Sequence, residues 1–178
     1  MVDDERAERR AFPANAIHLV RTTQQIHVQL SAMADQKASI LMGATFVIFT
    51  IAVGHSNGAG APLPLLILGG AAFLSALCAV GAVLPAVRFR RKAPLNLMFF
   101  GSFADLDEEE YIERLMAELE SDDRIYRTMA RDIYQNGLVL ARKKYRLLGY
   151  AYRTFLVGLC FSFAAFILSY FVDLPQLT

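Results

Sequence analysis

An acidic and a basic residue stand two positions apart at the start of a long apolar run. Asp35 and Lys37 precede the apolar segment 38–54. Residues two apart on an α-helix point about 200° apart, so these two side chains cannot pair with each other. At a membrane surface a lysine can extend to lipid phosphates, whereas an aspartate needs a cation or a donor from another helix. The partner that we predict is Lys144, which precedes another apolar run; the alternative is a hydrated Asp35.

The sequence has no pattern typical of an active site or of a metal site. It lacks the glycine-rich phosphate loop of nucleotide hydrolases. His18 and His27 are too far apart to share one helix face as metal ligands, and neither lies near a cysteine in the sequence. The acidic run 107–110 is better explained by the chemistry of a helix start. We therefore predict no catalytic residue, no metal and no cofactor, and expect that the protein is not an enzyme.

Three apolar segments are long enough, or nearly so, to cross a bilayer. They are residues 38–54, 63–87 and 147–172, and a helix needs about 20 residues to cross the hydrocarbon core. The chain is 55% hydrophobic, which is high for a soluble domain, and these segments account for the excess. We predict an all-α membrane protein with three transmembrane helices and a cytoplasmic helical bundle. The predicted division is a cytoplasmic N-terminal helix (1–37), the three spans, and a cytoplasmic helical region (88–146).

The distribution of basic residues predicts the orientation. Lys and Arg cluster after the second span and before the third, at Arg88, Arg90, Arg91, Lys92, Arg142, Lys143, Lys144 and Arg146. The connection 55–62 and the tail 173–178 carry none. Because basic residues collect on the cytoplasmic side, we expect a cytoplasmic N-terminus and a C-terminus outside.

Periodic apolar residues predict helices outside the spans as well. Before the first span, apolar or small residues recur in steps of four and three at Leu19, Thr23, Ile26, Leu30 and Met33. No Pro or Gly interrupts residues 14–42, which predicts one helix that begins after Pro13 and enters the first span. Asp107 and Ser121 predict two further helix starts, and the second helix is expected to continue past Gly137 into the third span. These helices should pack into a bundle, within the chain or between subunits.

Small residues recur at intervals of four in two of the spans. They are Ala71, Ser75 and Ala79 in the second span, and Gly158 and Ser162 in the third. Such spacing lets helices approach closely, either within one chain or between subunits.

Three short motifs, taken in order around the spans, resemble a known family. They are Ala34-Asp35-Gln36-Lys37-Ala38-Ser39, then Asn96-Leu97-Met98-Phe99-Phe100-Gly101, and Lys144-Tyr145. Together they are similar to the transmembrane effectors of Pycsar antiphage systems, from about residue 17 to the third span. The resemblance implies a partner cyclase that makes cyclic CMP or cyclic UMP on phage infection. It also implies an effector that impairs the bacterial inner membrane, so that the infected cell stops growing.

A cyclic mononucleotide carries one phosphate charge and a flat base, for which cationic and aromatic side chains are suited. The nucleotide-binding residues that we predict are Arg21, Arg124, Arg127, Arg131, Lys144 and Tyr145. The remaining motif residues are Asp35, Lys37, Asn96, Phe99 and Phe100. For each predicted residue, the alternative to a role in binding is a solvated or a core position. We expect a homo-oligomer in lipid, with no nucleic-acid partner. The alternative function is a constitutive anchor or assembly subunit that docks a cytoplasmic protein.

Overall fold

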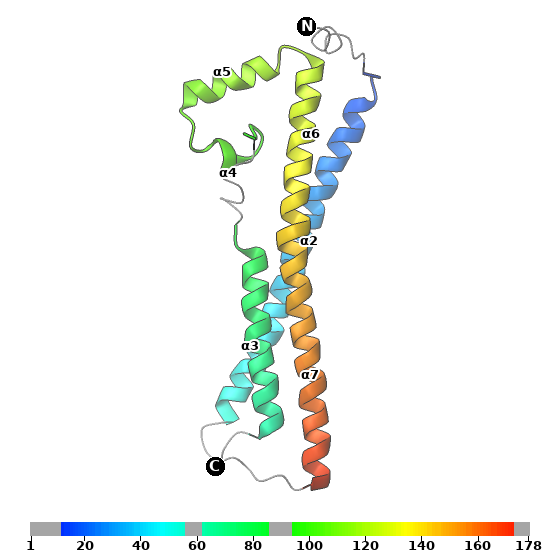
Figure 1. Ribbon diagram of the computed structural model, residues 1–178, viewed down its shortest axis with the longest axis vertical. Coiled ribbons are helices and arrows are strands. Elements are labelled where there is room, and N and C mark those ends of the chain that lie inside the picture. Colours follow the sequence, from blue (N-terminus) through cyan, green and yellow to red (C-terminus); the bar gives the residue numbers. More distant parts are fainter. Residues whose placement is uncertain (1–11, 56–61, 86–93, 173–178) are drawn as a thin grey trace. The chain divides into compact units, whose positions relative to one another are not determined.

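The computed structural model describes residues 12–55, 62–85 and 94–172, and these ranges contain helices and turns but no strand (Figure 1). The helices are α2 (Ala16–His55), α3 (Leu63–Val83), α4 (Phe100–Phe103), α5 (Glu108–Glu118), α6 (Asp122–Val139), the π-helix η1 (Leu140–Tyr145) and α7 (Arg146–Val172). Three of the described helical stretches are long and apolar enough to cross a membrane. The predicted class, an all-α protein with three such helices, is confirmed.

Helix α2 is continuous over its 40 residues, as predicted. It begins at Ala16, whose backbone N–H donates to the carbonyl of Pro13 at 2.9 Å. Proline has no N–H to contribute and is therefore suited to the position before a helix. The one helix thus contains both the predicted N-terminal helix and the first apolar segment.

Helices α6, η1 and α7 also follow one another without a break. Ser121 caps the start, because its Oγ accepts the backbone N–H of Arg124 at 3.4 Å. Gly137 does not end the helix, which confirms that prediction. The π-helical turn of η1 was not predicted; such turns contain one extra residue and are frequent at functional sites.

The chain divides into two compact units, and both α2 and the α6–α7 helix contribute to each. The first unit consists of Met1–Leu30 and Pro85–Leu140, and the second of Ser31–Leu84 and Ala141–Thr178. Because the division falls inside long helices, the units do not coincide with segments of the sequence.

The second unit packs α2, α3 and α7 together through small side chains. Its core contains Ala34, Ala38 and Leu41 from α2, Ala79 and Ala82 from α3, and Leu148 and Ala151 from α7. Gly158 lies so close to Ala71 that a Cβ at this glycine would overlap the alanine side chain. Ser75 Oγ donates to the carbonyl of Ala151 at 2.8 Å, and Ser162 Oγ donates to that of Pro64 at 2.7 Å. The predicted small-residue contact is therefore present, and it joins α3 to α7 within one chain.

The first unit holds the segment after residue 93 against α6. The carbonyl of Pro94 accepts Gln135 Nε2 at 2.9 Å, and the hydroxyl of Tyr111 on α5 donates to the carbonyl of Leu97 at 3.3 Å. Helix α5 begins after Asp107 as predicted, but the Asp107 side chain makes no capping hydrogen bond.

The predicted apolar stripes of α2 and α5 are not buried within the chain. On α2, Leu19, Ile26 and Met33 are 73%, 48% and 40% exposed. On α5, Ile112, Met116 and Leu119 are also exposed. Of the two predicted alternatives, burial within the chain does not hold for these exposed residues, and burial between subunits stays a prediction.

Candidate functional site

The structure joins Asp35 of α2 to Lys144 of η1. Lys144 Nζ donates to both carboxylate oxygens of Asp35, at 2.8 and 2.6 Å, and to Ser31 Oγ at 2.7 Å. The side chains of Lys144 and Asp35 are 17% and 39% exposed, so the lysine is the more deeply placed partner. The predicted ion pair is confirmed, and it lies within the second unit.

Two features of the sequence place this pair. Ser31 and Asp35 are four residues apart and therefore share one face of α2. Ala34 and Ala38, which are 3% and 0% exposed, let the helices approach closely beside that face.

The adjoining Lys143 reaches in another direction, and its Nζ donates to the carbonyl of Leu84 at 2.7 Å. Neighbouring lysines of the π-helical turn thus tie α7 to α2 and to the end of α3.

A second polar cluster surrounds the buried carboxylate of Asp132 in the first unit. Asp132 Oδ1 accepts Asn96 Nδ2 at 3.0 Å and Asn136 Nδ2 at 2.8 Å, and Oδ2 accepts Gln24 Nε2 at 3.1 Å. Asp132 and Asn96 are 7% and 1% exposed. Among the described residues no Lys, Arg or His forms a salt bridge with this carboxylate, so amide donors alone satisfy it. We name these four residues the amide–carboxylate network.

Asn96 belongs to this network for a structural reason. Its Oδ1 accepts the backbone N–H of Met98 at 2.9 Å, and its own N–H donates to Ser102 Oγ at 2.9 Å. The motif asparagine therefore shapes its own turn and fastens that turn to α6. Sequence reasoning missed Asp132, although Asp132 and Asn136 continue the periodic face of Ile125 and Met129 and could have been found there.

His27 of α2 packs against α6 beside this network. A Cβ at Gly137 would lie 3.1 Å from His27 Cε1, so the glycine leaves room for the imidazole ring. His27 Nδ1 is buried and has no hydrogen-bond partner among the described residues. The close contact explains a glycine inside α6, where glycine is otherwise unfavourable.

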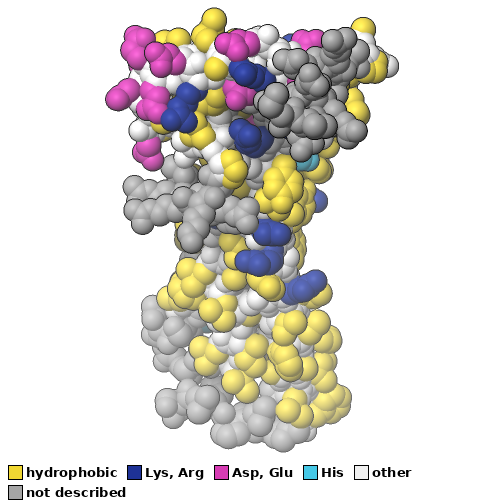
Figure 2. Space-filling model, turned by 45° about the horizontal axis from the view of Figure 1, so that its top comes forward, with side chains coloured by type: hydrophobic (Ala, Val, Ile, Leu, Met, Phe, Trp, Pro, Cys, Tyr) yellow, Lys and Arg dark blue, Asp and Glu magenta, His cyan; other side chains and the backbone are white. Residues whose placement is uncertain are grey.

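Three of the predicted nucleotide-binding arginines lie on α6. Arg124, Arg127 and Arg131 share a face of α6 because they are spaced by three and four residues. Arg124 pairs with Glu120, and Arg127 with Asp123. Figure 2 shows Lys and Arg side chains intermixed with Asp and Glu side chains over the α5–α6 region.

The other predicted site residues are placed as follows. Arg131 Nη1 reaches the carbonyl of Leu95 at 3.5 Å, and Arg21 is exposed on α2. Phe99 and Phe100 stack with their ring centroids 5.0 Å apart, and Phe100 is 60% exposed. Tyr145 is exposed in η1, directly after Lys144. Nucleotide binding by these residues stays a prediction.

The fold and these polar contacts define the class of the protein. The chain is a multi-pass α-helical membrane protein with a charged pair that joins α2 to η1 and a buried polar network around Asp132. Within the described ranges, no three His, Cys, Asp or Glu side chains come together in a group that could hold a metal ion.

Residues 18–171 match the Pycsar effector protein domain. The match covers most of the chain, so the protein belongs to the Pycsar effector family, and its role is that of an effector in antiphage defence. Neither the comparison with curated proteins nor the comparison with solved structures gave a match.

Proposed function

We propose that this protein responds to a cyclic pyrimidine mononucleotide, cyclic CMP or cyclic UMP, by impairing the inner membrane that it spans. The growth of the infected cell then stops before phage matures. The observation that carries the proposal is the extent of the Pycsar effector domain, which includes the three apolar helices within residues 18–171. A partner cyclase supplies the nucleotide, and the effector itself performs no catalysis.

The Asp35–Lys144 pair is suited to act as a latch in this response. A cyclic nucleotide carries a phosphate anion, which competes with a carboxylate for an ammonium group. Release of Lys144 would remove the hydrogen bonds that fasten η1 to α2. The π-helical turn contains one extra residue, and its conversion to α-helix would rotate α7 by about 100°. A ligand that stays outside the bilayer would in this way reorient a membrane helix.

Membrane impairment requires several copies of the chain. The helices of the second unit pack through alanine, glycine and serine, which leaves no room for a channel among them. The exposed residues Leu19, Ile26 and Met33 recur every seven positions on α2, which is typical of a helix that packs against another helix like itself. We therefore propose a homo-oligomer in which α2 contacts α2 of another copy. The basic residues beside the spans favour a cytoplasmic N-terminus and a C-terminus outside.

One observation favours the alternative function. The exposed apolar residues of α5, Ile112, Met116 and Leu119, lie on a helix rich in glutamate. Such a surface is suited to docking another protein, as a constitutive anchor or assembly subunit requires. This alternative predicts that no nucleotide changes the protein.

Thermal unfolding of the purified protein in detergent separates the two functions. At a concentration 100 times its dissociation constant, a ligand stabilises the folded protein by about 2.7 kcal/mol. We expect cyclic CMP or cyclic UMP to raise the unfolding temperature, with cyclic AMP and cyclic GMP as controls. If none of the four nucleotides shifts the transition, the proposed response is wrong and the docking function is favoured.

A further inference from the structure

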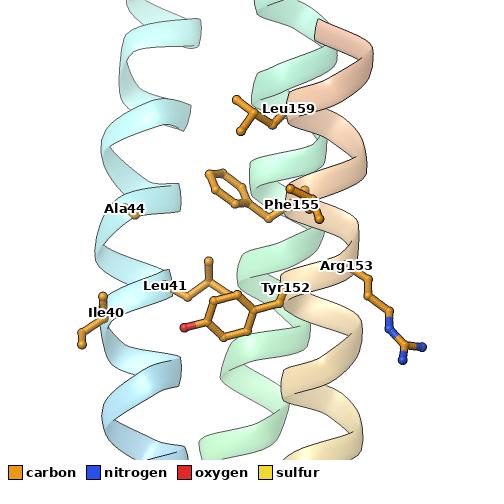
Figure 3. A pocket seen from close by; sticks show the side chains of 8 residues that line it. Ile40, Leu41, Ala44, Tyr152, Arg153, Phe155 and Leu159 are labelled. Carbon is orange, nitrogen blue, oxygen red and sulfur yellow. The ribbon is translucent and has the colours of Figure 1, made fainter. Parts of the chain in front are cut away.

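A groove runs between α2 and α7 in the second unit (Figure 3). Its volume is about 450 Å³, and its lining includes Ile40, Leu41 and Ala44 of α2 together with Tyr152, Phe155 and Leu159 of α7. Apart from the tyrosine hydroxyl these side chains are apolar. Ile40 is 64% exposed and Leu159 is 43% exposed, so the groove is open at the surface of the unit. Both helices are long and apolar enough to cross a membrane.

A cation, Lys37, stands at one end of the groove. Lys37 precedes Ile40, Leu41 and Ala44 by three, four and seven residues, so it stands on the same face of α2, one turn before the groove. The Tyr152 hydroxyl donates to the carbonyl of Lys37 at 3.3 Å, and Figure 3 shows the ring of Tyr152 reaching toward α2. This contact places the start of the groove beside Lys37.

A second cation, Arg153, also belongs to the lining of the groove. Figure 3 shows its guanidinium group beside α7, on the side away from α2. Lys37 and Arg153 are both exposed, and neither forms a salt bridge among the described residues. Cations at the edge of a membrane span require an anion or the headgroup layer.

We propose that this groove binds an anionic phospholipid, with one acyl chain against the apolar lining and the phosphate held by Lys37. The apolar segments 38–54, 63–87 and 147–172 contain no Asp or Glu, so the anion available beside them is a lipid phosphate. A second copy of the chain fits less well, because a symmetric contact here would bring the cations of both copies together. The inference does not depend on the nucleotide response.

The test measures the lipid that each variant retains. Protein is reconstituted with phosphatidylglycerol or phosphatidylcholine, and bound lipid is counted by native mass spectrometry after release into detergent. Ala44→Leu fills the groove, and Ala164→Leu is its matched control, because Ala164 is exposed on α7 and does not line the groove. We expect Ala44→Leu to weaken phosphatidylglycerol binding about tenfold, which corresponds to about 1.4 kcal/mol, and Ala164→Leu to bind as the wild type does.

The charge of the headgroup is tested separately. Lys37→Gln should reduce the preference for phosphatidylglycerol over phosphatidylcholine. Arg153→Gln is the control, because the Arg153 guanidinium lies on the side of α7 away from α2. The thermal unfolding of each variant confirms that it is folded. Equal lipid retention by Ala44→Leu and Ala164→Leu, or a headgroup preference that Lys37→Gln leaves unchanged, would overturn the proposal. Disulfide-linked dimers of Ala44→Cys, absent from the wild type with its Cys78 and Cys160, would also overturn it by showing that a second copy fills the groove.

Discussion

Asp35 and Lys144 are 109 residues apart in the sequence, yet their side chains are joined by two hydrogen bonds of 2.6 and 2.8 Å. The pair fastens the π-helical turn before α7 to the middle of α2. A charged pair that is only partly exposed is more sensitive to the loss of one partner than a surface pair, because the remaining ion stays desolvated.

A double-mutant cycle should detect this contact. We expect Asp35→Asn and Lys144→Met each to lower the free energy of unfolding by about 1–3 kcal/mol, since each leaves the other ion without its partner. The double variant should be less destabilised than the sum, with a coupling of about 0.5–3 kcal/mol. Chemical unfolding in detergent, followed by circular dichroism, measures both quantities. The exposed pair Glu110–Arg114 is the matched control and should show a coupling of about 0.3–0.5 kcal/mol. Strict additivity at Asp35 and Lys144 would contradict the latch.

The amide–carboxylate network predicts a large effect on stability at Asp132. Asp132→Ala removes the acceptor of three amides, one of which, that of Asn96, is buried. An unsatisfied buried amide costs about 1–3 kcal/mol, so the same unfolding measurement should show a loss of at least that size. Asp105→Ala, at an exposed aspartate, should stay within about 0.5 kcal/mol of the wild type. Equal stabilities of the two variants would mean that the network does not stabilise the first unit.

The exposed stripe of α2 gives a prediction about assembly. Ile26→Asp places a carboxylate where we expect contact with a second copy, at a cost of about 3 kcal/mol or more, so the association constant should fall more than about hundredfold. Val28→Asp is the control, because Val28 is 71% exposed on the same helix but lies off the stripe. The mass of the complex in detergent reports the outcome. If both variants assemble as the wild type does, the stripe is not an interface.

The orientation is tested with a reagent that does not cross membranes. A cysteine placed within residues 56–60 should react with an external maleimide in intact cells, and Asp107→Cys should react only after permeabilisation. The native Cys78 and Cys160 both lie in apolar helices, and the unmodified protein measures their background. Labelling of both introduced cysteines from the same side would contradict the predicted topology.

The features that could be predicted from the sequence were those set by local chemistry. Helix α2 was predictable because no Pro or Gly interrupts residues 14–42, and the Asp35–Lys144 pair because an aspartate at this position needs a cation. The inward face of α2 was not predictable by looking for large apolar residues. That face consists of Gln24, His27, Ser31, Ala34 and Ala38, since the helices here pack through small and polar side chains.

The π-helical turn and the amide–carboxylate network depend on tertiary contacts. Lys143 reaches the carbonyl of Leu84 at the end of α3, which no local pattern reveals. Asp132 is satisfied by amides from α2, from the turn at Asn96 and from its own helix, and these residues are distant in the sequence. Arg124 and Arg127, by contrast, pair with acidic residues four positions before them in the sequence, Glu120 and Asp123.

Leakage from proteoliposomes tests the central proposal most directly. The purified protein is reconstituted into phosphatidylglycerol-containing vesicles that enclose a self-quenching dye, and nucleotides are added on the side where Asp107→Cys is accessible. Cyclic CMP or cyclic UMP should release the dye from vesicles with protein and not from empty vesicles, while cyclic AMP and cyclic GMP should have no effect. Vesicles that stay sealed with both pyrimidine nucleotides, or that leak equally without any nucleotide, would contradict a nucleotide-triggered membrane effector.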